Sequence, residues 1–371
     1  MIRSILLLLA AALFFSACSS SPTDPELETS EPLLTASEMM VAMDAGFNLG
    51  NTFDLASNST DFDDIQPLIA TYQLAGMQHV RIPVTWMEGF GGNTLADANG
   101  HVDFSHPRFQ DLKRVIDYAL GRGMFVILNA HHERSFKQNY DGSAAFDERF
   151  TNLWTDIATH FKDYPQRLIF EPLNEPQDAF GSWGGAVSPQ DPTGLALTRQ
   201  IMRVGVEAIR ATGGSNAQRL IMIATNAHGN HSQIDDVYPT REALPGGGED
   251  PFIAIQVHTY DPWEFCGEDG RNSAFTGTAE LERSMRAVAL HARQLGVPVN
   301  YGEFGVGRRS NQADRNTDVV RSFYRTIVQV TRDEGMSSTA WDDRGWFGLI
   351  SGNPQIGYNF LHDIVPTMLA D

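Results

Sequence analysis

The sequence contains little cysteine, an excess of acidic over basic residues, and no recognisable phosphate-binding loop. Its two cysteines, Cys18 and Cys266, lie far apart in the chain, and neither belongs to a CxxC or Cys/His cluster. Structural zinc sites and disulfide frameworks depend on such spacings, so we expect no metal and no intrachain disulfide. The GxGxxG, Walker A and GxSxG patterns are also absent, and no other motif indicates a cofactor.

Positive charge is scarce. The 371 residues include 27 Lys+Arg against 46 Asp+Glu, which gives a formal net charge of -19. Nucleic acids and anionic lipid surfaces require a basic face on the protein that binds them. The composition therefore argues against both as partners, and it is compatible with an uncharged substrate. Solubility alone is a sufficient reason for the acidic excess.

Long hydrophobic runs are absent except near the N-terminus. The run from Ile5 to Phe15 follows the cation Arg3 and is too short to span a bilayer permanently. Residues 1–17 are therefore predicted to be a signal peptide of a secreted or cell-envelope protein. Its end, Phe15-Ser16-Ala17-Cys18, resembles a bacterial lipoprotein signal, although that pattern prefers leucine at the first position. We expect Cys18 to be lipidated and to be the only membrane anchor; an ordinary cleavage site nearby is the alternative.

Composition divides the remaining chain into two parts. Residues 18–36 are rich in Ser, Pro, Thr and Glu and contain almost no aromatic side chains, which predicts a disordered tether. Residues 37–371 have globular composition throughout, with no second linker and no solenoid repeat. We expect this part to form one catalytic domain that acts as a monomer.

Short apolar segments alternate with amphipathic helical patterns along the globular part. The candidate strands are residues 46–49, 79–82, 125–129, 168–173, 220–225, 252–257, 299–303 and 338–341, and later helices are expected at 191–211, 278–295 and 314–334. Eight strands alternating with helices predict an α/β fold of the (β/α)8 TIM-barrel type. The alternative, a doubly wound open sheet, would be expected to carry a glycine-rich phosphate loop after its first strand. The long loops at 177–191, 228–250 and 262–278 are expected to wall a cleft.

Polar and aromatic residues gather where the candidate strands end. The strand at 168–173 runs directly into Asn174 and Glu175, and the strand at 299–303 ends at Glu303. The carboxyl ends of parallel barrel strands meet at one rim, where the active sites of such barrels lie. The other strand ends contribute Arg81, Asn129, His131, His132, Asn226, His228, His258, Tyr260, Trp263 and Trp341.

These strand ends also carry a family resemblance. The motifs are Gly46-Phe47-Asn48-Leu49-Gly50-Asn51-Thr52, Arg81-Ile82-Pro83, Asn129-Ala130-His131-His132-Glu133, Asn174-Glu175-Pro176, His258-Thr259-Tyr260, Gly302-Glu303-Phe304-Gly305 and Trp341-Asp342. Each motif is weak alone, but the ordered set over residues 40–350 resembles glycoside hydrolase family 5, the cellulase family. The resemblance implies that Glu175 is the acid/base and Glu303 the nucleophile. It further implies active-site positions for Arg81, His131, Asn174, His258, Tyr260 and Trp341.

The chemistry of these residue types agrees with those roles. Retaining glycoside hydrolysis uses two carboxyls about 5–5.5 Å apart, one ionised and one protonated. Arg81 is a permanent cation that would keep Glu303 ionised, with a hydrogen bond from Tyr260. A charged Glu303 would then bias Glu175 toward keeping its proton. Trp341 would provide an apolar floor for the sugar ring.

Several residues also have simpler readings. Glu171 shares the strand and the side-chain direction of Glu175, which indicates a hydrogen-bonded residue of the barrel interior. Adjacent strand residues point to opposite faces, so His131 and His132 do not form a typical metal pair; we expect His132 to line a subsite or to support the site from behind. The loop acids Asp54, Asp342 and Asp343 are expected to cap loops, and Met39, Met40 and Met43 to fill the core. Five tryptophans are expected on the catalytic side, some of them as packing residues and two or three in contact with sugar: Trp86, Trp183, Trp263, Trp341 and Trp346. Trp154 is expected on the buried face of a helix.

The sequence therefore predicts a secreted, retaining endo-β-glucanase that cleaves internal β-1,4 or mixed-linkage bonds of a polysaccharide. Soluble or amorphous β-glucan is the expected substrate, because no separate carbohydrate-binding module is visible. Three alternatives stay open: a β-mannanase or other β-glycosidase of the same family, a surface lipoprotein that binds glycans without catalysis, and a metal-dependent barrel hydrolase.

Overall fold

The computed structural model describes residues 33–89 and 94–370. The predicted signal peptide 1–17, the lipidation candidate Cys18 and most of the predicted tether 18–36 lie outside the described residues. Helix α1 (Ala36–Met43) begins one residue before the boundary expected at 37, and Thr35 and Glu38 form a capping box at its start.

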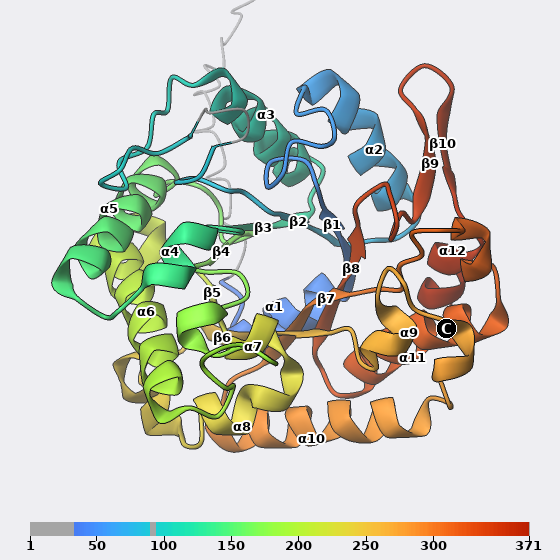
Figure 1. The fold of residues 1–371 in the computed structure, drawn as a ribbon. Coiled ribbons are helices and arrows are strands. Elements are labelled where there is room, and N and C mark those ends of the chain that lie inside the picture. The colour runs from blue at the N-terminus through green and yellow to red at the C-terminus, as the bar shows by residue number, and fades with distance from the viewer. Residues whose placement is uncertain (1–32, 90–93, 371) are drawn as a thin grey trace, which may run out of the picture. The chain divides into compact units, whose positions relative to one another are not determined.

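Eight parallel strands close into one barrel, in the order in which they occur in the chain (Figure 1). The predicted (β/α)8 barrel is thereby confirmed. Each observed strand overlaps a candidate strand, with ends that differ by a few residues. The strands are β1 (Ala45–Leu49), β2 (His79–Ile82), β3 (Phe125–Asn129), β4 (Leu168–Glu171), β5 (Ile221–Ala224), β6 (Ile253–Thr259), β7 (Val299–Phe304) and β8 (Ser337–Asp342).

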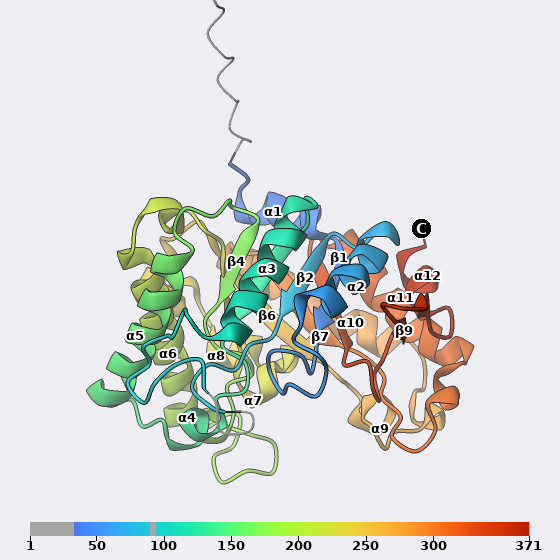
Figure 2. The ribbon, with the colours of Figure 1, turned by 90° about the horizontal axis from the view of Figure 1, so that it is seen from above.

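Long helices surround the barrel, and short helices occupy the loops that follow the strands (Figures 1 and 2). The helices after α1 are α2 (Phe62–Leu74), α3 (Pro107–Gly121), α4 (Arg134–Asn139), α5 (Ala144–His160), α6 (Pro192–Ala211), α7 (Asn226–Gly229), α8 (Ile234–Val237), α9 (Trp263–Cys266), α10 (Ala279–Leu295), α11 (Asp318–Asp333) and α12 (Ile364–Leu369). Local sequence explains their boundaries. In α6, for example, Asp191 caps the amides of Thr193 and Gly194, and Pro192 occupies the first helical position.

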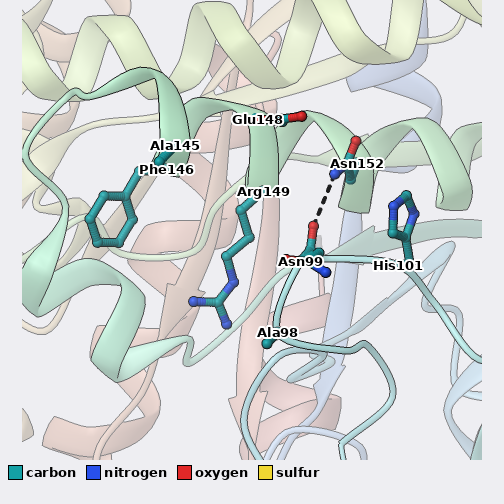
Figure 3. Close-up of a pocket in the computed structure, with 8 residues that line it drawn as sticks. All are labelled: Ala98, Asn99, His101, Ala145, Phe146, Glu148, Arg149 and Asn152. Carbon is teal, nitrogen blue, oxygen red and sulfur yellow. Dashed lines mark hydrogen bonds between the residues drawn. The ribbon is translucent and has the colours of Figure 1, made fainter.

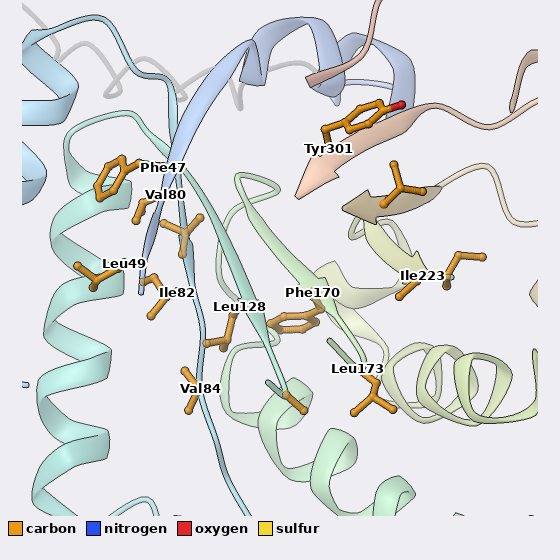
Figure 4. Close-up of a cluster of buried hydrophobic side chains, with 14 of the residues drawn as sticks. Phe47, Leu49, Val80, Ile82, Val84, Leu128, Phe170, Leu173, Ile223 and Tyr301 are labelled. Carbon is orange, nitrogen blue, oxygen red and sulfur yellow. The ribbon is translucent and has the colours of Figure 1, made fainter. Parts of the chain in front are cut away.

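The main core lies between the barrel and its helices, where outward-facing strand residues such as Val80, Leu128 and Phe170 are fully buried (Figure 4). Trp154 of α5 joins this core, and its indole N–H donates to the carbonyl of Pro172 at 2.9 Å. Trp86 follows the carboxyl end of β2, on the side where it was expected, and it is a packing residue there. Its side chain is fully buried near Phe109, and its indole N–H donates to the Asn129 carbonyl at 2.8 Å.

The barrel interior changes from apolar to polar along its axis. At the amino ends of the strands, Met39, Met40 and Met43 of α1 pack against inward-facing residues such as Ile127 and Met222 and close that end of the barrel. Figure 2 shows α1 at one end of the barrel, with α4 and α9 at the other. The predicted core role of the three methionines is confirmed.

Side chains two residues further along the same strands point into the same interior, because strand residues alternate between faces. In this way Phe125 and Ile127 are followed by Asn129, and Ala254 is followed by Gln256. These polar side chains form a buried layer directly beneath the catalytic rim.

A hairpin follows the barrel and was not expected from the sequence. Strands β9 (Ile350–Asn353) and β10 (Gly357–Phe360) pair antiparallel outside the barrel (Figure 1). The Tyr358 hydroxyl donates to the Asp64 carbonyl in α2 at 3.2 Å, and Phe360 packs beside Tyr72.

Within residues 33–89 and 94–370, no helix has the length and apolar character that crossing a bilayer requires.

Candidate active site

A cleft of about 800 Å³ opens at the carboxyl ends of the strands. Most of the site residues predicted from the sequence line it, while Arg81 is buried against Glu303, and Asn174 is buried against Arg81. The predicted residues along its wall are His131, His132, Glu175, His258, Tyr260, Trp263, Glu303 and Trp341. Residues that the sequence did not single out for this cleft include Ala227, Asn230, Ser232, Asp261 and Phe347.

The two predicted catalytic glutamates meet in this cleft from different sides of the barrel. One carboxylate oxygen of Glu175, which follows β4, and one of Glu303, in β7, lie within 4.8 Å of each other. Glu303 is almost fully buried, and 23% of the Glu175 side chain is exposed. Glu175 also has a left-handed backbone with φ of 45°, an uncommon conformation for a residue other than glycine and one often found at functional sites.

Arg81 connects the buried polar layer to Glu303. Its guanidinium donates to Glu303 Oε1 at 2.8 Å and to both carboxylate oxygens of Glu171 at 2.7 and 2.8 Å. It also donates to the amide oxygens of Asn48 at 2.7 Å and Asn174 at 2.6 Å. Glu171 is thus a hydrogen-bonded residue of the barrel interior, as its position in the strand predicted, and its partner Arg81 makes the contact an ion pair. The arrangement fixes the guanidinium beneath the rim and places a permanent positive charge at Glu303.

Glu303 accepts hydrogen bonds at both oxygens, because the Tyr260 hydroxyl donates to Oε2 at 3.1 Å. Burial raises the pKa of Glu303, and the nearby charges of His258 and Arg81 oppose that rise. Tyr260 is partly buried, and desolvation together with the charge of Glu303 raises the pKa of its hydroxyl, so it acts as a hydrogen-bond donor.

Glu175 has a histidine near each oxygen. His258 Nδ1 lies 2.9 Å from Oε1, and His228 Nδ1 lies 3.9 Å from Oε2. Burial raises the pKa of Glu175, but hydrogen bonding to His228 and His258 outweighs burial and lowers it. The sequence predicted the opposite bias, with Glu175 holding its proton because Glu303 is charged. That reasoning omitted both histidines, which come from other strands and loops.

Lys137, which the sequence reasoning missed, lies beneath Glu175. Its side chain is 1% exposed, and its ammonium donates to the carbonyls of His131, Asn174 and Glu175 at 3.2–3.4 Å. Burial lowers the pKa of Lys137, opposed first by the charge of Glu175. Lys137 therefore ties the end of β3 to the segment that carries Glu175. A lysine on the short helix α4 gives no sequence signal for such a contact.

Two groups on this rim, Asp54 with His131 and His132, and Glu175 with His258 and Glu303, bring possible metal-ligand atoms within 4.8 Å of one another. The first group is the histidine-rich one. Asn129 argues against it. The Asn129 amide nitrogen donates to Glu171 and faces His131 Nδ1 at 3.2 Å, while its oxygen accepts from Val84. His131 Nδ1 must therefore accept, which leaves the proton on Nε2 and gives that atom no lone pair for a metal. The same proton places a hydrogen on the His131 nitrogen that faces the buried Asp54 carboxylate, whose Oδ2 lies 4.0 Å away.

Aromatic side chains form the apolar surfaces of the cleft. Trp341 lies parallel to the His131 ring, with centroids 5.8 Å apart, and 57% of Trp263 and 55% of Trp183 is exposed. Asp54, Asp342 and Asp343 cap loops as predicted, since each accepts a backbone N–H close to it in sequence.

The comparison with known families agrees with this geometry. The family model "Cellulase (glycosyl hydrolase family 5)" matches residues 43–344. The chain belongs to glycoside hydrolase family 5. Among characterised relatives, this family-5 chain is 31% identical to Endoglucanase B of Clostridium cellulovorans over 296 residues, which is 76% of this chain and 63% of the relative. It is 27% identical to Endoglucanase A of Clostridium longisporum over 92% of this chain, and it spans 66% of that relative's length.

Solved structures give the same result. The family-5 barrel superposes on a GH5-4 broad specificity endoglucanase from Clostridium acetobutylicum with a TM-score of 0.73 and 25% identity, covering 91% of this chain and 100% of the other. A glycoside hydrolase 5 lichenase from Caldicellulosiruptor, solved with cellotetraose, has a TM-score of 0.71 and 25% identity, with 93% and 98% covered.

A second hollow, of about 550 Å³, lies between α5 and the loop before α3 (Figure 3). Asn152 of α5 donates across it to the Asn99 carbonyl at 3.0 Å. None of the residues predicted for the family-5 site lines this hollow, and it contains no pair of converging carboxyls. Its lining is Ala98, Asn99, His101, Ala145, Phe146, Glu148, Arg149 and Asn152.

Proposed function

We propose that the protein is a secreted, retaining endo-β-glucanase that hydrolyses internal β-1,4 or mixed-linkage bonds. One observation carries this proposal: oxygens of Glu175 and Glu303 lie within 4.8 Å of each other in an open cleft. That separation fits double displacement, whereas inverting enzymes keep their carboxyls about 6.5–9.5 Å apart to hold a water between them.

In the first step, Glu303 attacks the anomeric carbon and forms a glycosyl–enzyme ester, while the bond to the leaving sugar breaks. Glu175 transfers a proton to the leaving oxygen as that bond breaks. Arg81 and Tyr260 hold the two Glu303 oxygens and orient the attacking one. Asn174 would hydrogen-bond the sugar 2-hydroxyl, and the Trp341 ring would support the apolar face of the sugar.

In the second step, the covalent bond has removed the negative charge of Glu303. Glu175, now ionised, takes a proton from water, and the resulting hydroxide attacks the anomeric carbon and releases Glu303. The proton that Glu175 gave to the leaving sugar is thereby restored. Two displacements at the same carbon retain its configuration.

The substrate class is supported by the form of the cleft and by relatives. The cleft is open, and its exposed rings Trp183 and Trp263 offer stacking surfaces for several sugars of one chain. The related solved proteins are described as broad specificity endoglucanases or as bound to cellotriose or cellotetraose. We therefore favour β-glucans over the alternative β-mannan, and soluble or amorphous polymers over crystalline cellulose.

The central experiment is a reducing-sugar assay of wild type, Glu175→Ala and Glu303→Ala on carboxymethylcellulose, mixed-linkage glucan, xyloglucan and β-mannan. Both variants should lose nearly all activity on the best substrate. With an activated aryl glycoside, azide should rescue Glu303→Ala with inverted product and Glu175→Ala with retained product.

The outcomes separate the alternatives. A wild type that binds glucan without hydrolysing it would make the protein a binding lipoprotein, and inhibition by chelators would favour metal-dependent hydrolysis. Higher activity on β-mannan than on the β-glucans would favour the β-mannanase alternative. High activity in either alanine variant would contradict the assigned roles.

We also propose that Cys18 carries a lipid that anchors the protein in the cell envelope. The support is the apolar run before Phe15-Ser16-Ala17-Cys18. Wild type expressed in a bacterium should label with radioactive palmitate, and Cys18→Ser should not. Equal labelling of the two, or none in wild type, would contradict the anchor.

A further inference from the structure

The inference concerns Gln256, a side chain that is 1% exposed in the polar layer beneath the cleft. It lies on β6, two residues before His258, so both side chains point into the barrel. A Cβ on residue 302 would lie 2.4 Å from the Gln256 amide carbon. The glycine at 302 therefore leaves the space that Gln256 fills.

The orientation of the Gln256 amide follows from its partners. Its nitrogen donates to Glu171 Oε2 at 2.8 Å. Glu171 is a carboxylate bound twice by Arg81; burial raises the pKa of Glu171, but Arg81 outweighs burial and lowers it. An ionised carboxylate only accepts hydrogen bonds, so the amide nitrogen must face Glu171 and the amide oxygen must face the other way.

That oxygen, Gln256 Oε1, lies 3.3 Å from His258 Nε2. An amide oxygen only accepts, so His258 Nε2 carries a proton. The other ring nitrogen, Nδ1, lies 2.9 Å from Glu175 Oε1. If the ring is neutral, its Nδ1 is an acceptor and cannot donate to an ionised Glu175.

The hydrogen bond between His258 and Glu175 therefore needs a further proton, either on Nδ1 or on Glu175. Losing that proton would leave two acceptors facing each other at 2.9 Å, which is unfavourable in a buried site. Groups that could alter this balance surround His258: Glu171 and Glu175 from β4 and the loop after it, Glu303 from β7, Arg81 from β2, His131 after β3 and His228 in α7.

We propose that Gln256 is a positioning residue that fixes His258 as the Nε2–H tautomer and thereby makes the Glu175–His258 pair retain the proton used in catalysis. This inference rests on the proposed function, because it assigns a source for the acid's proton. Ion-paired Arg81 and Glu171 hold Gln256, which orients His258, which in turn holds Glu175. The pair keeps its proton to higher pH than a freely rotating histidine would allow.

The test compares wild type with Gln256→Met, which keeps the length of the side chain and removes its acceptor. Without that acceptor, neutral His258 can move its proton to Nδ1 and donate to ionised Glu175, so the pair gives up its catalytic proton more easily. The loss of one ordinary hydrogen bond should move the basic limb of kcat/KM on a β-glucan oligosaccharide down by about 0.7 pH unit.

Two readouts distinguish positioning from general damage. A dinitrophenyl glycoside needs no proton to release its leaving group. The kcat/KM of Gln256→Met on this substrate should therefore stay within about twofold of the wild-type value. In 15N spectra of the imidazole nitrogens at high pH, the proton of His258 should be on Nε2 in wild type and on Nδ1 in the variant. The spectra report on His258 whether or not the protein hydrolyses glucan, so the two proposals can fail separately.

Thr339→Val is the matched control, since Thr339 is buried in the same interior and hydrogen-bonds His79 and not His258. It should lower stability and leave both the pH limb and the His258 tautomer unchanged. An unchanged basic limb in Gln256→Met, an Nδ1–H tautomer in wild type, or equal losses on activated and unactivated substrates would each overturn the inference.

Discussion

Replacing Arg81 by methionine tests the electrostatic basis of the proposed nucleophile. Arg81 is fully buried and bridges two carboxylates, Glu171 at 2.7 Å and Glu303 at 2.8 Å. Methionine preserves much of the volume and removes the charge. Both carboxyls would then lie in the barrel interior without their cation, and each would hold a proton more tightly.

The size of the effect follows from Coulomb's law. Two unit charges about 4 Å apart at an effective dielectric constant of about 20 interact by about 4 kcal/mol. That energy changes the ratio of ionised to protonated Glu303 by about a thousandfold. At pH 6 we expect kcat/KM to fall by about two to three powers of ten, and to recover as pH rises. Breaking the buried pair should also lower the free energy of unfolding by about 3–5 kcal/mol.

The assay is the pH dependence of kcat/KM on an activated aryl cellobioside, for which the acid is not needed and the nucleophile dominates. Urea unfolding, monitored by circular dichroism, identifies conditions under which the variant is folded. Arg81→Lys keeps the charge and loses the bidentate contact with Glu171. Its kcat/KM at pH 6 should lie between the values of wild type and Arg81→Met. A folded Arg81→Met variant whose acid limb stays at the wild-type pH would refute the reasoning.

Three further predictions concern buried residues. Burial lowers the pKa of His79 to about 4, against about 6.5 in an unfolded chain, so the unfolded state takes up the proton first as pH falls. The free energy of unfolding should therefore decrease by about 3 kcal/mol between pH 6.5 and pH 4. Urea unfolding of His79→Gln should show a flatter pH dependence. Lys137→Met should leave three carbonyls without their donor, lowering stability by about 2–4 kcal/mol and reducing kcat more than it changes KM. Trp154→Phe should cost about 1–3 kcal/mol in thermal unfolding, because the Pro172 carbonyl loses its donor, with KM unchanged.

The fold was predictable because its signals are local and repeated. Strands β3, β4 and β5 are short segments rich in apolar residues, and helix faces such as that of Ile65, Leu68 and Tyr72 follow the helical period. The hairpin at 350–360 was missed because its strands, Ile-Ser-Gly-Asn and Gly-Tyr-Asn-Phe, have only four residues each and are mostly exposed, which is too short for a convincing periodic pattern. A tryptophan at a strand end, such as Trp86, can point into the core or into the cleft. The hydrophobic periodicity of the sequence does not distinguish these two orientations.

The placement of the candidate site residues was predictable to a similar degree, and their electrostatics were not. That Glu175 and Glu303 share a rim follows from barrel topology, whatever the intervening sequence. The protonation bias of Glu175 depends instead on His258 and His228, which come from other strands and loops. Lys137 acts through hydrogen bonds to backbone carbonyls, and Gln256 acts through the hydrogen bond that selects the tautomer of His258. No residue type or spacing marks such contacts before the barrel has closed.

The position of α1 has a practical consequence. The methionine-bearing helix seals the end of the barrel opposite the cleft, and Leu34 precedes it there, with its amide and carbonyl bound by Gln166. A resin, nanoparticle or fusion partner coupled ahead of Leu34 would therefore be joined at the closed base. Polymer chains would still have access to the open mouth, so immobilised protein should keep its turnover on large glucans as fully as on short ones.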